Sequence, residues 1–191
     1  EGRPPVPSAS MFHVKQRAPT VIGTANLSLS SRPSRSGYRG ADCEVDIDGS
    51  SGLIVGYRAI GTSFLDGGAF RALVMRDSAD PWGMKVRGFR DSLGEFVLMT
   101  PHAAAALAGI RAPDLDPVRI IEDGPVRTVV EALFAHGRSL LRLRYMLPKR
   151  GAEVEVDARV LWAETDAMLK LAVPTAMRAM RRAMYSGCSP P

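Results

Sequence analysis

The chain has 191 residues, of which 46% are hydrophobic and 24% charged, and its formal net charge is +5. These values suit one globular domain of ordinary size and exclude wholesale disorder and two full domains. The basic excess comes from arginines scattered among acids and from a basic tail, without a stripe that interleaves aromatics. We therefore expect no nucleic-acid site.

Cysteine usage and hydropathy indicate the compartment. Cys43 and Cys188 are the only cysteines, and they lie far apart and outside any metal-ligand spacing. This excludes a disulfide framework and a zinc site and favours a reducing compartment. No apolar run reaches the roughly 18 residues of a membrane span, and no secretory leader pattern opens the chain. We expect a cytoplasmic protein that does not bind membranes.

The first predicted element is a hairpin that follows an irregular leader. Residues 1–41 are rich in Ser, Pro, Arg and Gly and lack periodicity, which predicts a disordered leader. The stretches DCEVDID and LIVGYRAI, separated by GSSG, then predict two paired strands. Gly49 and Gly52 are free to take positive φ in that turn.

Two more strands and a short helix come next. The runs AFRALVMR (69–76) and GEFVLMT (94–100) predict strands, joined by a loop that contains DSADPWGM. PHAAAALAG (101–109) predicts one or two helical turns, because alanine is the strongest helix former and Gly109 can close the end.

Residues 118–174 show the most regular pattern, in which apolar alternation is punctuated by DGP, HGRS, PKRG and ETD. This predicts a β-meander. Clean alternation favours an antiparallel sandwich with one packed and one wet face rather than a parallel sheet buried on both sides. The predicted core-facing residues are Leu141, Leu143, Tyr145, Leu147, Val154, Val156, Ala158, Val160 and Trp162.

A basic tail ends the chain over residues 175–191. Met177, Met180 and Met184 have helical spacing with arginines between them, which predicts either a short amphipathic helix or a frayed tail.

Catalytic motifs are few. There is no phosphate loop, GxSxG elbow, HExxH or CxxC, and the histidines, His13, His102 and His136, are isolated in sequence. A glycosidase needs two carboxylates beside its scissile bond, but the candidates lie in or beside turns, where acids hold backbone amides. We assign these to turns: Glu122, Asp123, Glu164 and Asp166. Lys170 is expected at an exposed or edge position.

The DSADPWGM loop is the best candidate for a functional surface. Asp77 and Asp80 offer acceptors to sugar hydroxyls, and Trp82 offers an apolar face to a pyranose ring. The alternative is structural, with Trp82 covering the sheet and Asp77 fixing a turn.

Several of these stretches together resemble a known family. GGAFRALVMRDSADPWGM, GEF, and the run from RIIEDGPVRTVVEALF to LWAETDAMLKLAVP are similar to the start of the C-terminal β-sandwich region of glycoside hydrolase family 38 α-mannosidases. The shared features are an acidic D-x-x-D-x-W loop, an EDGPVR turn and a W-x-E…LK pair of strands, in this order. The resemblance covers about residues 42–174. Pro81 departs from it, since the family loop usually has a small polar residue there.

The resemblance implies a large sandwich related to galactose mutarotase-like domains, of which this chain would be part. It also implies retaining hydrolysis of terminal α-mannosides by an α/β barrel that holds zinc and supplies an aspartate nucleophile. Neither barrel motif occurs here, so we carry over no catalytic residue, metal ligand or cofactor. Only Asp77, Asp80 and Trp82 are carried over, as substrate-binding residues beside the pocket.

We therefore expect an all-β, partial sandwich at residues 42–174, the accessory part of an α-mannosidase and inactive alone, as if an interrupted gene had kept one middle piece. Two alternatives stay open. One is a stand-alone carbohydrate-binding or partner-binding module that uses the DSADPWGM loop. The other is a subunit that completes a separately encoded catalytic barrel. The expected partners are a mannoside and such a barrel.

Overall fold

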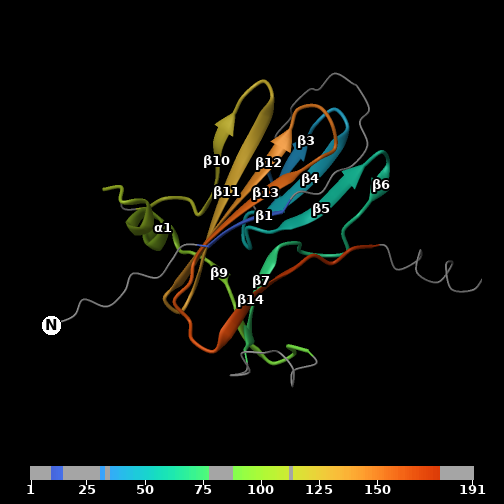
Figure 1. Ribbon diagram of the computed structural model, residues 1–191. Coiled ribbons are helices and arrows are strands. Elements are labelled where there is room, and N and C mark those ends of the chain that lie inside the picture. Colours follow the sequence, from blue (N-terminus) through green and yellow to red (C-terminus); the bar gives the residue numbers. More distant parts are fainter. Residues whose placement is uncertain (1–9, 15–30, 33–34, 78–87, 112–113, 177–191) are drawn as a thin grey trace, which may run out of the picture.

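The computed structural model describes residues 10–14, 31–32, 35–77, 88–111 and 114–176 (Figure 1). Antiparallel strands dominate these residues, and a single short helix interrupts them. The elements are β1 (Ser10–Val14), β2 (Ser31–Arg32), β3 (Arg35–Arg39), β4 (Cys43–Asp48), β5 (Ile54–Ala59), β6 (Thr62–Ser63), β7 (Arg71–Arg76), β8 (Ser92–Glu95), β9 (Val97–Leu98), α1 (Pro101–Ala108), β10 (Val118–Asp123), β11 (Arg127–His136), β12 (Ser139–Pro148), β13 (Glu155–Leu161) and β14 (Ala167–Ala172).

The largest sheet, called here the main sheet, has six strands. Its order is β1-β13-β12-β11-β10, and β9 pairs with the far end of β11. Strands β10 to β13 are consecutive antiparallel neighbours, which confirms the predicted meander. The meander ends one strand early, however, because β14 leaves this sheet and pairs with β7.

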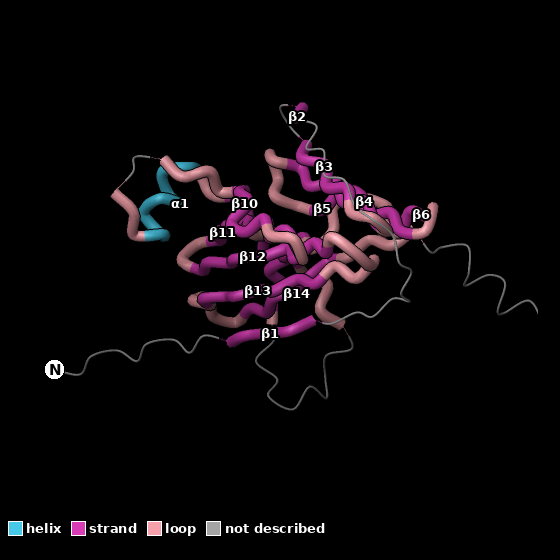
Figure 2. The backbone as a smooth tube through the Cα atoms, turned by 90° about the horizontal axis from the view of Figure 1, so that it is seen from above, coloured by secondary structure: helices cyan, strands magenta, loops and turns pink. Residues whose placement is uncertain are grey.

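Two smaller sheets face the main sheet. One has five strands in the order β2-β3-β4-β5-β6 and the other has three in the order β14-β7-β8. An isolated bridge between Ile54 and Ala69 links the two sheets. One continuous core contains side chains from β4, β5, β7 and from β11 to β13, so these sheets pack on one another (Figures 1 and 2). The prediction of an antiparallel β-sandwich is confirmed.

The predicted alternation is also confirmed. Along β12, buried and half-buried residues alternate without a break, as the pleat of a strand requires. Trp162 is half-buried against the core, with its ring centroid 6.4 Å from that of Phe96. The β4–β5 hairpin is confirmed too, although of its two predicted glycines only Gly52 takes positive φ, at 70°.

Two expectations need correction. The sheet begins before residue 42, because β3 pairs with β4 and its Tyr38 is 6% exposed, with its hydroxyl donating to the Pro148 carbonyl. The strand predicted at 94–100 is two short strands, since β8 pairs with β7 and β9 with β11, so the chain crosses here from one layer to the other. The remaining boundaries of the expected domains stay predictions, and residues 177–191 of the basic tail lie outside the described residues.

Helix α1 confirms the predicted helical turns and covers part of the outer face of the main sheet. The Thr100 hydroxyl caps its first turn by accepting from the Ala103 amide at 3.3 Å, and Gly109 ends it with φ 66°. Its Ala104 packs against Leu133 of β11, away from β3 to β6 (Figure 2). Consequently β11 is buried on both faces, and the expected wet face is wrong for this strand. Within the described ranges, no helix has the length and apolarity to cross a membrane.

Candidate functional site

The connection from β7 to β8, which contains the DSADPWGM stretch, starts and ends at fixed points of the three-stranded sheet. The backbone amide of Asp77, directly after β7, donates to the Asp166 carbonyl at 2.8 Å. One residue earlier, the Arg76 amide donates to the Asp91 carbonyl at 2.8 Å, so both ends of the loop are tied together. Asp77 is half-buried at this base, whereas Asp80 and Trp82 lie outside the described residues. The structure therefore places one of the three predicted residues and does not test their role.

Lys170 supports the return of this loop. It lies on β14, an edge strand of its sheet, which confirms the expected edge position. Its Nζ donates to the Phe89 carbonyl at 2.8 Å and lies 5.4 Å from the centroid of the Phe89 ring. The ammonium group thus has a carbonyl and an aromatic face as partners and is half-buried. Its contacts are those of a residue that anchors the loop.

The EDGPVR turn uses both of its carboxylates structurally. Arg127 donates to Glu122 through Nε at 2.9 Å and Nη2 at 3.0 Å, and this hydrogen-bonded guanidinium lowers the Glu122 pKa. Asp123 accepts from Lys149 Nζ at 2.6 Å and from the Thr128 hydroxyl at 2.8 Å, which lower its pKa. The predicted turn position is confirmed, but these partners are side chains rather than the backbone amides that we expected.

Glu164 and Asp166 lie between β13 and β14, where a turn was predicted. Glu164 accepts from the Ser139 hydroxyl at 2.9 Å, and Asp166 has φ 50°. Antiparallel order puts this connection at the opposite end of the main sheet from the β10–β11 turn. Neither carboxylate of one turn can therefore pair with a carboxylate of the other turn across a single glycosidic bond.

The remaining reactive side chains of the described residues are dispersed. His136 Nδ1 lies 3.1 Å from the Glu95 carbonyl, and its ring centroid is 5.7 Å from that of Phe96. Cys43 is a buried free thiol, and burial raises its pKa to about 11, so it stays protonated and weakly nucleophilic near neutral pH. In the described ranges no group of three His, Cys, Asp or Glu side chains is placed to hold a metal ion.

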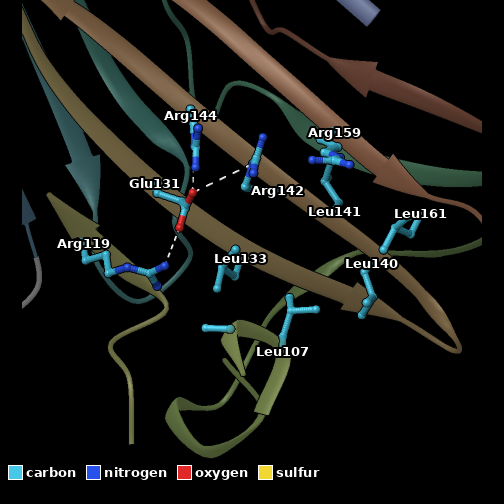
Figure 3. Close-up of a pocket in the computed structure, with 11 residues that line it drawn as sticks. Leu107, Arg119, Glu131, Leu133, Leu140, Leu141, Arg142, Arg144, Arg159 and Leu161 are labelled. Carbon is cyan, nitrogen blue, oxygen red and sulfur yellow. Dashed lines mark hydrogen bonds and ion pairs between the residues drawn. The ribbon is translucent and has the colours of Figure 1, made fainter. Parts of the chain in front are cut away.

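Sequence reasoning missed a cluster on the outer face of the main sheet, which we call the arginine pocket (Figure 3). Its centre is Glu131 of β11, whose side chain is 5% exposed. One carboxylate oxygen accepts from Arg119 Nη2 and the other from Arg144 Nε at 2.8 Å, and Arg142 approaches from β12. Leucines from α1 and the sheet complete a pocket of about 280 Å³.

A sequence signal for this cluster existed. Glu131 stands within the apolar run VVEALF, and arginines occupy alternate positions of the next strand in LLRLRYML. A two-residue turn between His136 and Ser139 fixes the register and places Glu131 directly opposite Arg144. An acid inside a buried strand needs such a partner, because a buried unpaired charge is costly.

Comparison with known families agrees with the fold. The chain matches the family model described as "Glycosyl hydrolases family 38 C-terminal domain" over residues 80–188, which is more than half of its length. No match to a curated protein was found. The match begins within the predicted functional loop and continues through the main-sheet meander and β14. The chain therefore belongs to glycoside hydrolase family 38, as part of the β-rich C-terminal domain of that family.

Proposed function

We propose that this chain is the accessory sandwich of an α-mannosidase and that its loop after β7 forms part of the rim of a mannoside pocket. The observation that carries the proposal is the family match over residues 80–188, which begins inside this loop and continues through β8 and β14, two strands of the sheet at its base. Hydrolysis of terminal α-mannosides would be performed by a catalytic barrel on another domain or chain, and the sandwich alone would be inactive.

The base of the loop supports a binding role. The Asp77 amide donates a hydrogen bond to the Asp166 carbonyl, which fixes the backbone at this point. Among the described residues, none donates a hydrogen bond to the Asp77 carboxylate, so its oxygens are available to sugar hydroxyls. A carboxylate held by a tied backbone accepts hydrogen bonds without a further cost of ordering the chain. Asp80 and Trp82 would add a second acceptor and an apolar face, as proposed from the sequence.

The zinc ion that the family resemblance implies has no place in this role. The described side chains provide no group of three metal ligands, and the proposed contribution of the chain is limited to hydrogen bonding and stacking. The proposed partners are a mannoside and the catalytic barrel. The two distant cysteines, one of them a buried free thiol, favour action in the cytoplasm.

Calorimetric titration with α-mannobiose tests the proposal, after a cooperative thermal transition has been recorded. We expect saturable binding with a Kd of about 1 mM, because a rim alone buries little of the ligand. Trp82→Ala should weaken this binding about 10-fold, since stacking on an aromatic ring is lost. The control is Asp66→Ala, an exposed acid away from the loop, which should bind like the unmodified chain.

Two results would decide against the proposal. A cooperatively folded chain that does not bind α-mannobiose has no sugar rim. Release of nitrophenol from 4-nitrophenyl α-mannopyranoside by the chain alone would contradict the accessory role. Binding near 1 µM would instead favour the stand-alone carbohydrate-binding module, because such affinity requires a complete site.

A further inference from the structure

We propose that the arginine pocket binds a small organic carboxylate, with the carboxylate between Arg142 and Arg159 and an apolar group against the neighbouring leucines. This site is separate from the loop after β7 and does not depend on the proposed mannoside rim. It is built from the outer faces of β10 to β13 and from α1 (Figure 3).

The register of the main sheet creates an unbalanced row of cations. One row across the outer face alternates in charge, from Arg119 to Glu131 to Arg144 and then Asp157. The next row places Arg142 directly opposite Arg159, without an acid between them. Like charges directly opposite one another destabilise a sheet, so this row gains from an added anion.

Arg142 also lacks a hydrogen-bond acceptor, which an anion in the pocket could supply. Its Nε atom is buried and has no hydrogen-bond partner. Arg142 has two ion pairs, but both are long, with Glu131 Oε2 at 3.8 Å from Nε and Asp157 Oδ2 at 3.5 Å from Nη2. A buried donor without a partner is destabilising, so the guanidinium of Arg142 is incompletely satisfied and can gain from an added acceptor. Arg159 is exposed and has no ion pair within the described part of the chain.

The other end of the pocket is apolar. Leu107 of α1 and Leu161 of β13 line it, and they are 41% and 42% exposed. Leu140 lies opposite Leu161 in the register, one row beyond the arginine pair. A ligand that places a carboxylate on the arginines therefore places its hydrocarbon group on leucines. Removal of these apolar surfaces from water would add to the affinity.

The position of the acids favours a carboxylate over a phosphate dianion. Among the described residues, the ion pairs of this cluster use only Glu131 and Asp157, and the four arginines Arg119, Arg142, Arg144 and Arg159 leave a positive excess that an anion can balance. A phosphate dianion would approach both acids and be repelled by them, whereas a carboxylate brings one charge. Its planar pair of oxygens also matches the fork of a guanidinium group.

Binding of hexanoate to the full chain, followed by two-dimensional NMR or calorimetry, tests this inference. We expect saturable binding that is at least about 10-fold tighter than that of acetate, because the hydrocarbon chain reaches the leucines. Hexanamide, which is the same size but neutral, should not saturate. Inorganic phosphate should bind more weakly than hexanoate.

The variants keep the test independent of folding. Arg159→Met removes an exposed guanidinium and should weaken hexanoate binding about 10-fold. Arg58→Met removes an exposed arginine from β5, in the opposite layer, and should leave binding unchanged. Equal affinity for hexanoate and hexanamide, or equal losses in the two variants, would overturn the inference. Binding of a glutamate-containing peptide without binding of hexanoate would also overturn it, because the site would then recognise a polypeptide.

Discussion

Gly52 is a residue at which the two layers of the sandwich meet, and its substitution gives the sharpest test of the fold. It lies in the β4–β5 turn, where its amide donates to the Asp48 carbonyl at 2.7 Å. Its carbonyl accepts from the Tyr145 hydroxyl of the main sheet at 2.9 Å. Because Gly52 is buried and has φ 70°, Gly52→Ala tests both backbone conformation and interlayer packing.

The expected loss of stability has two components. An L-residue in the left-handed region costs about 1–2 kcal/mol. An added Cβ would lie 2.8 Å from Leu98 Cδ1 and 3.0 Å from Phe134 Cζ, closer than carbon atoms pack. Overpacking of this kind costs about 1–3 kcal/mol. Together they predict a loss of about 2–5 kcal/mol in the free energy of unfolding.

Gly61→Ala is the matched control. Gly61 has φ 73°, almost the same as Gly52, but an added Cβ would meet no atom within 4 Å. Urea denaturation of both variants, analysed by linear extrapolation, therefore separates the packing cost from the backbone cost. Only the backbone cost of about 1–2 kcal/mol is expected at Gly61. If Gly52→Ala destabilises the chain no more than Gly61→Ala, the described packing of the turn against the main sheet is wrong.

Three further predictions concern the site regions. In urea denaturation, Glu131→Ala should lower the free energy of unfolding by about 3 kcal/mol, because it removes the acid that pairs with partly buried arginines. The control is Glu44→Ala, at an exposed ion pair, which should lower it by less than about 1 kcal/mol. Trp162→Ala should cost about 2 kcal/mol in that assay, because the ring is half-buried; unchanged stability with lost sugar binding would refute its core role. The folded-state pKa values of Glu122 and Asp123 are lowered, so their contribution is present above the unfolded pKa of about 4 and is lost as pH falls through the folded values. The stability difference between the chain and its Glu122→Gln/Asp123→Asn variant should therefore disappear in acid titrations of urea unfolding.

Alternation in the sequence predicts faces well, but it does not predict partners. The inward positions of β12 and β13 follow from the two-residue period, since one face of each strand is apolar. The same pattern continues into β14, which nevertheless pairs with β7. A strand with this alternation can pair with any antiparallel neighbour of the same pattern. The pairing of β14 with β7 is therefore determined by the turn at Glu164 and Asp166 and by packing against residues distant in the sequence. The division of 94–100 into β8 and β9 has the same cause.

The arginine pocket depends on information that one strand does not contain. In the sequence, Arg142 and Arg144 occupy alternate positions of β12, a pattern typical of the solvent-exposed face of a sheet. Only the register of both flanking strands gives them different surroundings, because Arg144 lies between Glu131 and Asp157, whereas Arg142 lies between a leucine and Arg159. A shift of one residue in either pairing would turn each strand over and remove the cluster. The two turns that flank β12 therefore determine both the packed core on one face and the excess of positive charge on the other.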